Sequence, residues 1–147
     1  MHRPVIAPTP DSPASHAVGL DLDGTLTVPG PWLGGRIALP QPGAIDALRL
    51  LAAQRAVFVY TARPRHWLPE VADWVTWYSG LPAFVDPDPE RAYWTSVGGP
   101  ILVTSTKLGA ACYVDDRAVH HTGDWASTLA VVTRAIGLDR AAGRVPA

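Results

Sequence analysis

Short apolar runs recur along this chain, and each of them ends at a turn or at polar residues. Runs of this length, bounded in this way, are typical of strands that are buried on both faces of a parallel sheet. The pattern predicts strands at Ala17–Leu20, Ala56–Tyr60, Leu81–Val85 and Ala111–Val114. A further run, Ile101–Val103, is either a short strand or the flank of one.

Between these runs, apolar residues recur at helical spacing. This spacing predicts helices over Gly43–Gln54, His66–Tyr78 and Asp124–Ile136. The second helix carries an aromatic stripe that we interpret as core, and Trp77 lies off it. The third has Asp124 as its N-cap and a stripe that we expect to be buried, made of Trp125, Leu129, Val132 and Ile136.

Alternation of strands and helices favours an α/β fold, a three-layer α/β/α sandwich around a mainly parallel, Rossmann-like sheet. We expect one domain over residues 16–138, after a flexible, Pro-rich N-terminal tail at 1–15 and before a C-terminal tail at 139–147. Glycines and prolines in Thr27–Pro40 exclude a long helix there and predict a loop, or a short flap hairpin, beside the end of the first strand.

Composition narrows the class of protein. The formal net charge of −1 argues against a broad surface for nucleic acid or membranes. The single cysteine, Cys112, allows no internal disulfide, and its apolar setting predicts a buried strand position in a reducing compartment. No apolar run approaches membrane-spanning length, so we expect a cytoplasmic protein.

Polar residues gather where three of the predicted strands end. Asp21 and Asp23 follow the first strand, Thr61 follows the second, and Asp115 and Asp116 follow the last. Open α/β sheets place their sites at the carboxyl ends of strands. Neighbouring carboxylates repel one another, and a divalent cation would offset that repulsion. Thr61 could equally cap the helix that follows it.

The ordered set of these residues resembles the haloacid dehalogenase (HAD) superfamily. Its first motif matches the DLDGT sequence from Asp21 to Thr25, and its second matches Thr61. Its third motif matches Lys107, which could otherwise be a plain surface lysine, and its fourth matches Asp115 and Asp116. The connections are too short for a cap domain, so the chain is similar to small capless members.

The resemblance implies a role for each matched residue. Asp21 would be the nucleophile and Asp23 the general acid and base, with Thr61 and Lys107 completing the catalytic set. Mg²⁺ would be held directly by Asp21 and by one of the two acids Asp115 and Asp116, which of them being left open, with Asp23 contributing its main-chain carbonyl. Phosphate contacts would come from Leu22, Gly24, Thr25, Ala62 and Arg63.

The implied activity is that of a Mg²⁺-dependent phosphomonoesterase that acts through an aspartyl phosphate. Receiver-type signalling domains use similar residues, but they place the acidic pair early and the nucleophile in mid-chain. A catalytically degenerate HAD domain, kept as a binding module, is the other alternative. All three functions leave the predicted fold unchanged.

An open site without a cap suits a large substrate, or requires a lid from the partner in a homodimer. We expect a preference for nucleotide or oligonucleotide phosphate ends, and no membrane partner. Arg63, Arg65 and His66 are candidates for contacts to further phosphates, and Trp32 or Trp94 for stacking against a base. Arg63 could instead be a structural ion-pair partner.

Overall fold

The computed structural model describes residues 12–30 and 34–137. Its five strands form one sheet in the order β3-β4-β2-β1-β5, and every neighbouring pair is parallel. The strands are β1 (Ala17–Asp21), β2 (Ala56–Tyr60), β3 (Ala83–Val85), β4 (Ile101–Thr104) and β5 (Cys112–Val114). The predicted α/β fold with a parallel, Rossmann-like sheet and no cap domain is therefore confirmed.

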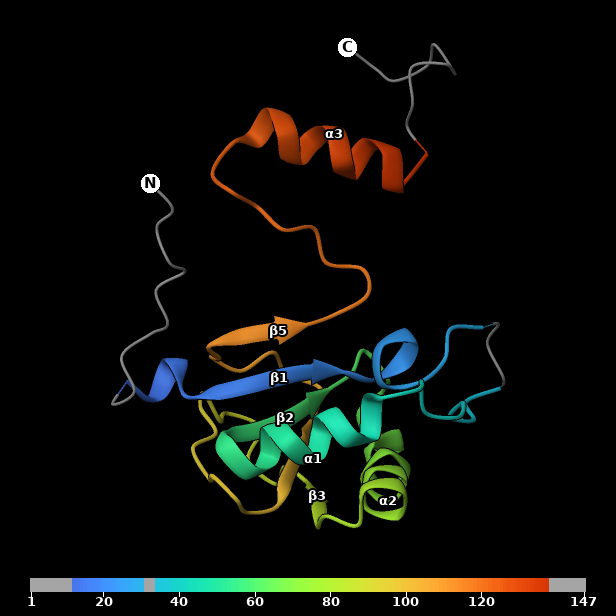
Figure 1. Cartoon of the computed structure of the whole chain (residues 1–147), viewed down its shortest axis with the longest axis vertical. Helices are drawn as coiled ribbons and strands as arrows, with labels where there is room; N and C mark the ends of the chain where they lie inside the picture. The colour runs from blue at the N-terminus through green and yellow to red at the C-terminus, as the bar shows by residue number, and fades with distance from the viewer. Residues whose placement is uncertain (1–11, 31–33, 138–147) are drawn as a thin grey trace. The chain divides into compact units, whose positions relative to one another are not determined.

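The described residues contain three α-helices (Figure 1). They are α1 (Ala44–Gln54), α2 (Leu68–Ser79) and α3 (Trp125–Ala135), each within two residues of its predicted bounds. Gly80 ends α2 with a φ of +74°, a conformation that costs glycine little. A single 3₁₀ turn, Arg65–Trp67, precedes α2 and replaces its predicted first turn.

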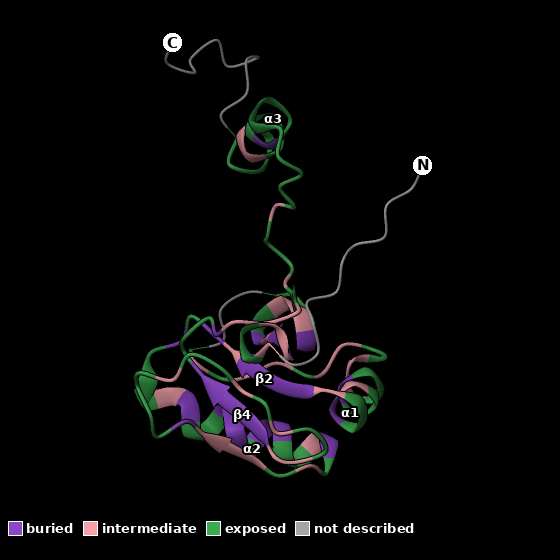
Figure 2. Ribbon diagram, turned by 90° about the vertical axis from the view of Figure 1, so that its left-hand side faces the viewer, coloured by how far each residue is buried: buried purple, intermediate pink, exposed green. Residues whose placement is uncertain are grey.

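Alternate strand residues separate the two faces of the sheet. Val57 and Val59 belong to the cluster formed with α1 and α2, whereas Phe58 points to the other face. On that second face Phe58 packs with Leu102 and Leu108, and Trp94 lies against them. Figure 2 shows the buried strands β2 and β4 at the centre of this arrangement.

The chain divides into two compact units, residues 1–116 and 117–147. The first contains the whole sheet, α1 and α2. The second contains α3 and the segment that leads into it. The boundary between the two units therefore falls inside the single domain predicted for residues 16–138. Each unit is described by itself below.

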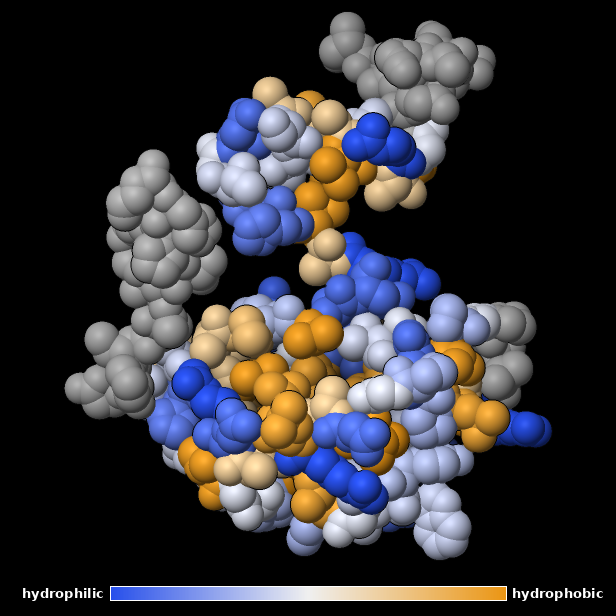
Figure 3. Space-filling model, in the orientation of Figure 1, coloured by the Kyte–Doolittle hydropathy of each residue, from blue (hydrophilic) through white to orange (hydrophobic). Residues whose placement is uncertain are grey.

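Within its own unit, the apolar stripe on α3 does not have the burial that the sequence predicted. Trp125, Leu129 and Ile136 are 71%, 62% and 61% exposed, and only Thr128 of this helix is buried. One helix with a short leading segment has too little chain to cover an apolar stripe. Figure 3 shows hydrophobic surface on this helix beside hydrophilic side chains. The predicted N-cap is confirmed, because the carboxylate of Asp124 accepts a hydrogen bond from the amide of Ala126 at 3.1 Å.

The predicted burial of Cys112 is also wrong, since its side chain is exposed. Its strand, β5, stands at the edge of the sheet and has β1 as its one neighbour. The apolar run therefore predicted the strand correctly. Whether the residues of such a strand are buried depends on the position of the strand in the sheet.

Most of the predicted N-terminal tail, residues 1–11, lies outside the described residues, whereas its last residues, 12–15, are described. Residues Pro13–Ser15 form a 3₁₀ turn. The guanidinium of Arg55 donates to the carbonyl oxygens of Ser15 and His16, at 3.3 Å and 3.1 Å. These bonds fix the entry of the chain into β1.

Candidate functional site

The candidate site lies at the carboxyl end of β1, between the ends of β2 and β5. Asp21 is the last residue of β1, and the sheet register pairs it with Tyr60, the last residue of β2. On the other side, Leu20 pairs with Val114, and Asp115 follows directly. The register thus brings Asp115 to the same level of the sheet as Asp21.

Three carboxylates meet at this point. One oxygen each of Asp21, Asp115 and Asp116 lies within 4.8 Å of the others. Asp21 and Asp115 are half-buried and Asp116 is exposed. Hard oxygen donors at such separations fit a single Mg²⁺ or Ca²⁺ ion, which would also relieve their mutual repulsion. The three residues are those that the sequence pattern had indicated as candidate ligands.

The cluster alters the acidity of its central member. Burial, together with the negative charges of Asp115 and Asp116, raises the pKa of Asp21 to about 6. The hydroxyl of Thr25 opposes this effect, because it donates a hydrogen bond to Asp21 Oδ2 at 3.2 Å. Without a cation, the ionised form of Asp21 is therefore disfavoured.

The loop after β1 is shaped to fit against the acidic cluster. Gly24 has a φ of +82°, and a Cβ at this position would collide with the carboxylate of Asp116. Its amide donates to Thr27 Oγ1 at 3.0 Å, and its carbonyl accepts from Gln41 Nε2 at 2.9 Å. Glycine is needed here both for the turn and for the close approach.

Two residues that hold the site together were missed in the sequence. Gln41 Nε2 donates to the carbonyls of both Gly24 and Thr27, each at 2.9 Å. The hydroxyl of Tyr60 donates to Asp115 Oδ2 at 3.0 Å, and burial together with this bond raises the pKa of Tyr60. The place of Tyr60 at the end of a strand could have indicated its contact, whereas nothing in the spacing indicates Gln41.

Asp23, two residues from Asp21, has a different environment. Its side chain is 47% exposed and lies outside the three-carboxylate cluster. Arg63 donates to both of its oxygens, from Nε at 2.9 Å and from Nη2 at 2.8 Å. The side chain of Arg63 is only 5% exposed, so the structural ion-pair alternative describes it, and its predicted contact with substrate phosphate finds no free surface.

Thr61 follows β2 and is buried. Its amide donates to the carbonyl of Thr104 at 3.2 Å, and its hydroxyl oxygen accepts from the amide of Arg63 at 3.1 Å. The hydroxyl thus closes a turn instead of capping α2. Next to it Ala62 is exposed, whereas Leu22 is fully buried.

Lys107 is exposed and rests on an aromatic ring. Its Nζ lies 4.3 Å from the ring centroid of Tyr113, which in turn meets the ring of Tyr60 edge-on at 6.1 Å. Neither of the ion pairs found within residues 12–30 and 34–137 includes Lys107. Along this series of contacts, the rings of Tyr113 and Tyr60 lie between Lys107 and Asp115.

The other residues predicted to contact the substrate differ in how exposed they are. Arg65 and His66 are exposed, and Arg65 Nη2 donates to the carbonyl of Asp86 at 2.6 Å. Trp94 packs against Phe84 with its indole nitrogen buried, so it is no free stacking surface. Trp32 lies outside the described residues.

The loop over the site is held at its base as a short antiparallel pair. Thr27 and Pro40 form an antiparallel bridge, and the amide of Val28 donates to the carbonyl of Leu39 at 2.8 Å. These contacts fit the base of the predicted flap hairpin, whose middle residues 31–33 lie outside the described residues.

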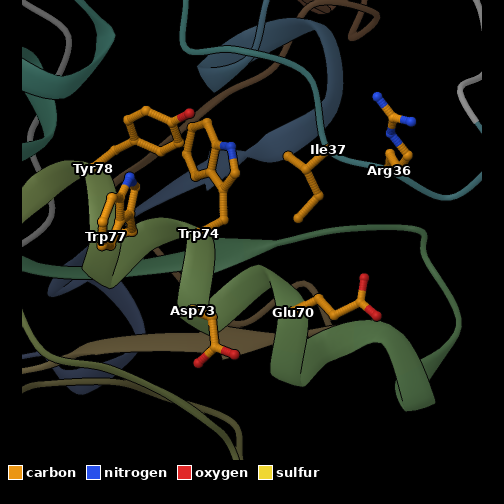
Figure 4. Close-up of a pocket in the computed structure, with 7 residues that line it drawn as sticks. All are labelled: Arg36, Ile37, Glu70, Asp73, Trp74, Trp77 and Tyr78. Carbon is orange, nitrogen blue, oxygen red and sulfur yellow. The ribbon is translucent and has the colours of Figure 1, made fainter.

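A separate hollow of about 500 Å³ lies on α2, away from the carboxylates (Figure 4). Its lining combines aromatic rings with charged side chains, namely Arg36, Ile37, Glu70, Asp73, Trp74, Trp77 and Tyr78. Trp77 is 81% exposed, as the helical pattern predicted. The hollow contains none of the candidate site residues.

No protein-family model matches the chain, and no curated protein matches it. A conserved protein of Bacteroides thetaiotaomicron, known from a solved structure, is similar to it at 24% sequence identity and a TM-score of 0.50. The aligned region covers 82% of this chain and 92% of that one. This likeness extends to the fold alone. Across the described residues, no helix combines the length and apolarity needed to cross a membrane.

Proposed function

We propose that the protein is a Mg²⁺-dependent phosphomonoesterase of the HAD type, acting through an aspartyl phosphate. The observation that carries this proposal is the cluster of Asp21, Asp115 and Asp116 at the carboxyl end of β1. Asp21 is the one member that lies on a strand, at the end of β1 and directly before a glycine-bearing loop. A nucleophile at such a position can meet a phosphate that is held by the loop amides.

The reaction would proceed in two displacements. A carboxylate oxygen of Asp21 forms a bond to phosphorus while the bond to the leaving oxygen breaks, and Asp23 gives that oxygen its proton. Water then attacks the same phosphorus, the bond to Asp21 breaks, and Asp23 takes up the proton of the water. The hydroxyl of Thr25 orients Asp21 through its bond to Oδ2.

The three carboxylates would hold Mg²⁺, with Tyr60 orienting Asp115 from behind. When bound, the cation supplies positive charge that offsets the charges of the carboxylates and of the phosphate. The residues of this chain then have two tasks, to align Asp21 with phosphorus and to place the proton of Asp23 at the leaving oxygen.

For the substrate, we propose nucleotide or oligonucleotide phosphate ends. The absence of a cap domain supports a large substrate, and the exposed Arg65 and His66 offer contacts beside the site. With Arg63 engaged by Asp23 and Trp94 half-buried against Phe84, these contacts are fewer than the sequence indicated. A cytoplasmic location, and a homodimer partner acting as a lid, belong to the same proposal.

The test is hydrolysis of p-nitrophenyl phosphate by the purified protein with and without Mg²⁺. We expect turnover that requires Mg²⁺, and a loss of about a thousandfold or more in kcat for Asp21→Asn. Asp73→Asn is the same substitution at an exposed position of α2. It serves as the matched control and should keep full activity. Wild-type protein that binds Mg²⁺ without any turnover would favour a binding module instead.

The substrate class is tested with a panel of phosphate esters under the same conditions. It should contain nucleotides, oligonucleotides phosphorylated at the 3′ or the 5′ end, sugar phosphates and phosphopeptides. A tenfold advantage in kcat/KM for either of the last two classes contradicts the proposed preference.

A further inference from the structure

The guanidinium of Arg63 is the most enclosed charge beside the site. A buried charge is costly unless it is paired and hydrogen-bonded. Here the pair is bidentate, because Nε and Nη2 donate to the two different oxygens of Asp23. Two parallel bonds fix the plane of a carboxylate as well as its position. Asp23 therefore has one defined orientation although its side chain is half exposed.

The same guanidinium also holds the loop that follows the first motif. Nη1 donates to the carbonyl of Gly35 at 2.5 Å, and Nη2 lies 3.3 Å from the carbonyl of Arg36. Its carbon lies 5.7 Å from the ring centroid of Trp67, and this indole also packs on Gly35. Arg63 thus joins three segments that are far apart in the sequence.

We propose that Arg63 is a positioning residue, which orients the carboxylate of Asp23 and ties it to the loop at residues 34–36. This inference rests on the proposed function, in which Asp23 serves the leaving oxygen. A phosphate would have to displace Asp23 or the loop carbonyls to reach this guanidinium. Arg63 therefore acts through Asp23 and not on the substrate.

A positioning role of this kind has a kinetic signature. A phosphate ester with a poor leaving group needs a proton at its oxygen as the bond breaks, whereas p-nitrophenolate leaves without one. Loss of the correct Asp23 geometry should therefore slow the hydrolysis of an alkyl phosphate far more than that of p-nitrophenyl phosphate. A residue that binds phosphate would instead affect both esters equally and would raise KM.

The experiment compares kcat and KM for propyl phosphate and p-nitrophenyl phosphate. We expect Arg63→Gln to lower kcat about 100-fold for the alkyl ester and less than fivefold for the aryl ester, with KM nearly unchanged. Arg63→Lys should fall between the wild type and Arg63→Gln, because an ammonium cannot hold both oxygens at once. Arg49→Gln, which removes an exposed guanidinium on α1 that donates to the carbonyl of Ser79, is the matched control and should behave as wild type.

A double variant, Arg63→Gln with Asp23→Asn, gives a second test of the positioning role. If Arg63 acts through Asp23, the double variant should lose no more activity on propyl phosphate than Asp23→Asn alone. Independent losses that multiply, or equal losses on both esters with a raised KM, would overturn the positioning role.

Hydrogen exchange of the backbone amides at 34–39 provides a readout without catalysis. Exchange there should be at least tenfold faster in Arg63→Gln than in wild type and Arg49→Gln, because two loop carbonyls lose their donor. Unchanged exchange overturns the proposal, even if wild-type protein proves inactive and the proposed function fails. If Arg63→Gln does not fold, Arg63→Lys is measured in the same way, and unchanged exchange in that variant has the same consequence.

Discussion

The two carboxylates of the first motif, only two residues apart, lie in opposite electrostatic environments. Asp21 faces two further carboxylates, and its pKa is raised to about 6 by burial and by these charges. Asp23 faces the buried guanidinium of Arg63 instead. One half of the site is thus a concentration of negative charge and the other half is a satisfied pair. The same residue type, two positions apart, is given two different electrostatic environments by its neighbours.

The contrast can be tested first through the affinity for Mg²⁺. Asp115→Asn and Asp116→Asn should each weaken binding by about 30-fold or more, because each removes a charged oxygen ligand. Asp23→Asn should stay within about twofold of wild type, since its side chain lies outside the cluster. Isothermal titration calorimetry gives the three dissociation constants. A loss for Asp23→Asn as large as for Asp116→Asn would contradict the division of the site.

Removing the charge of Asp23 and removing the charge of Asp21 should change folding stability in opposite directions. Asp23→Asn should destabilise the metal-free protein by about 2 kcal/mol, because it leaves the buried guanidinium of Arg63 without its counter-charge. Urea unfolding at pH 7 measures this change. Asp88→Asn, on an exposed turn, is the control, and an unchanged midpoint for Asp23→Asn would show that the pair adds nothing to stability.

Tyr60→Phe tests whether the tyrosine hydroxyl holds Asp115 in place within the carboxylate cluster. The variant removes the bond to Asp115 Oδ2 and keeps the ring contacts. We expect about a tenfold weaker affinity for Mg²⁺, the size of effect typical of residues that orient a metal ligand. Tyr78→Phe, on α2, is the matched control. Equal affinities for both variants would mean that Asp115 is held without Tyr60.

The smallest expected effect is a gain in stability for Asp21→Asn. A carboxyl whose pKa is raised on folding destabilises the native state once it ionises, and the loss grows as pH rises from about 3.8 to about 6. The variant should therefore gain about 1 kcal/mol in metal-free protein above pH 6, a value reduced for solvent screening of this half-exposed group. The gain should vanish below pH 4. Thermal unfolding across this pH range, without metal, decides whether the difference has this sign.

Sequence reasoning was strongest where a single element carries the signal. The apolar run at Ala56–Tyr60 and the acids after β1 and β5 gave the strands and the three clustered carboxylates, because parallel strands place their carboxyl ends together. It could not give the partner of Asp23. The pair with Arg63 joins residues 40 positions apart, and only the path of the loop at 34–36 decides where the guanidinium lies.

Burial was harder to predict than secondary structure. The exposed Trp125 and Cys112 stand in apolar patterns that look like core, yet one lies on the lone helix of a small unit and the other on an edge strand. A periodic pattern tells which residues share a face. What covers that face depends on the rest of the fold, and this information is not local.

The shortness of β5 has a consequence for how the site responds to its surroundings. This three-residue edge strand precedes two of the three clustered carboxylates, and their repulsion from Asp21 opposes its pairing with β1. A cation bound by all three would favour the paired strand over a frayed one, by an amount that grows with the logarithm of its concentration. Fraying of this edge would then be coupled to the concentration of free Mg²⁺, because binding of the ion would favour the complete five-stranded sheet.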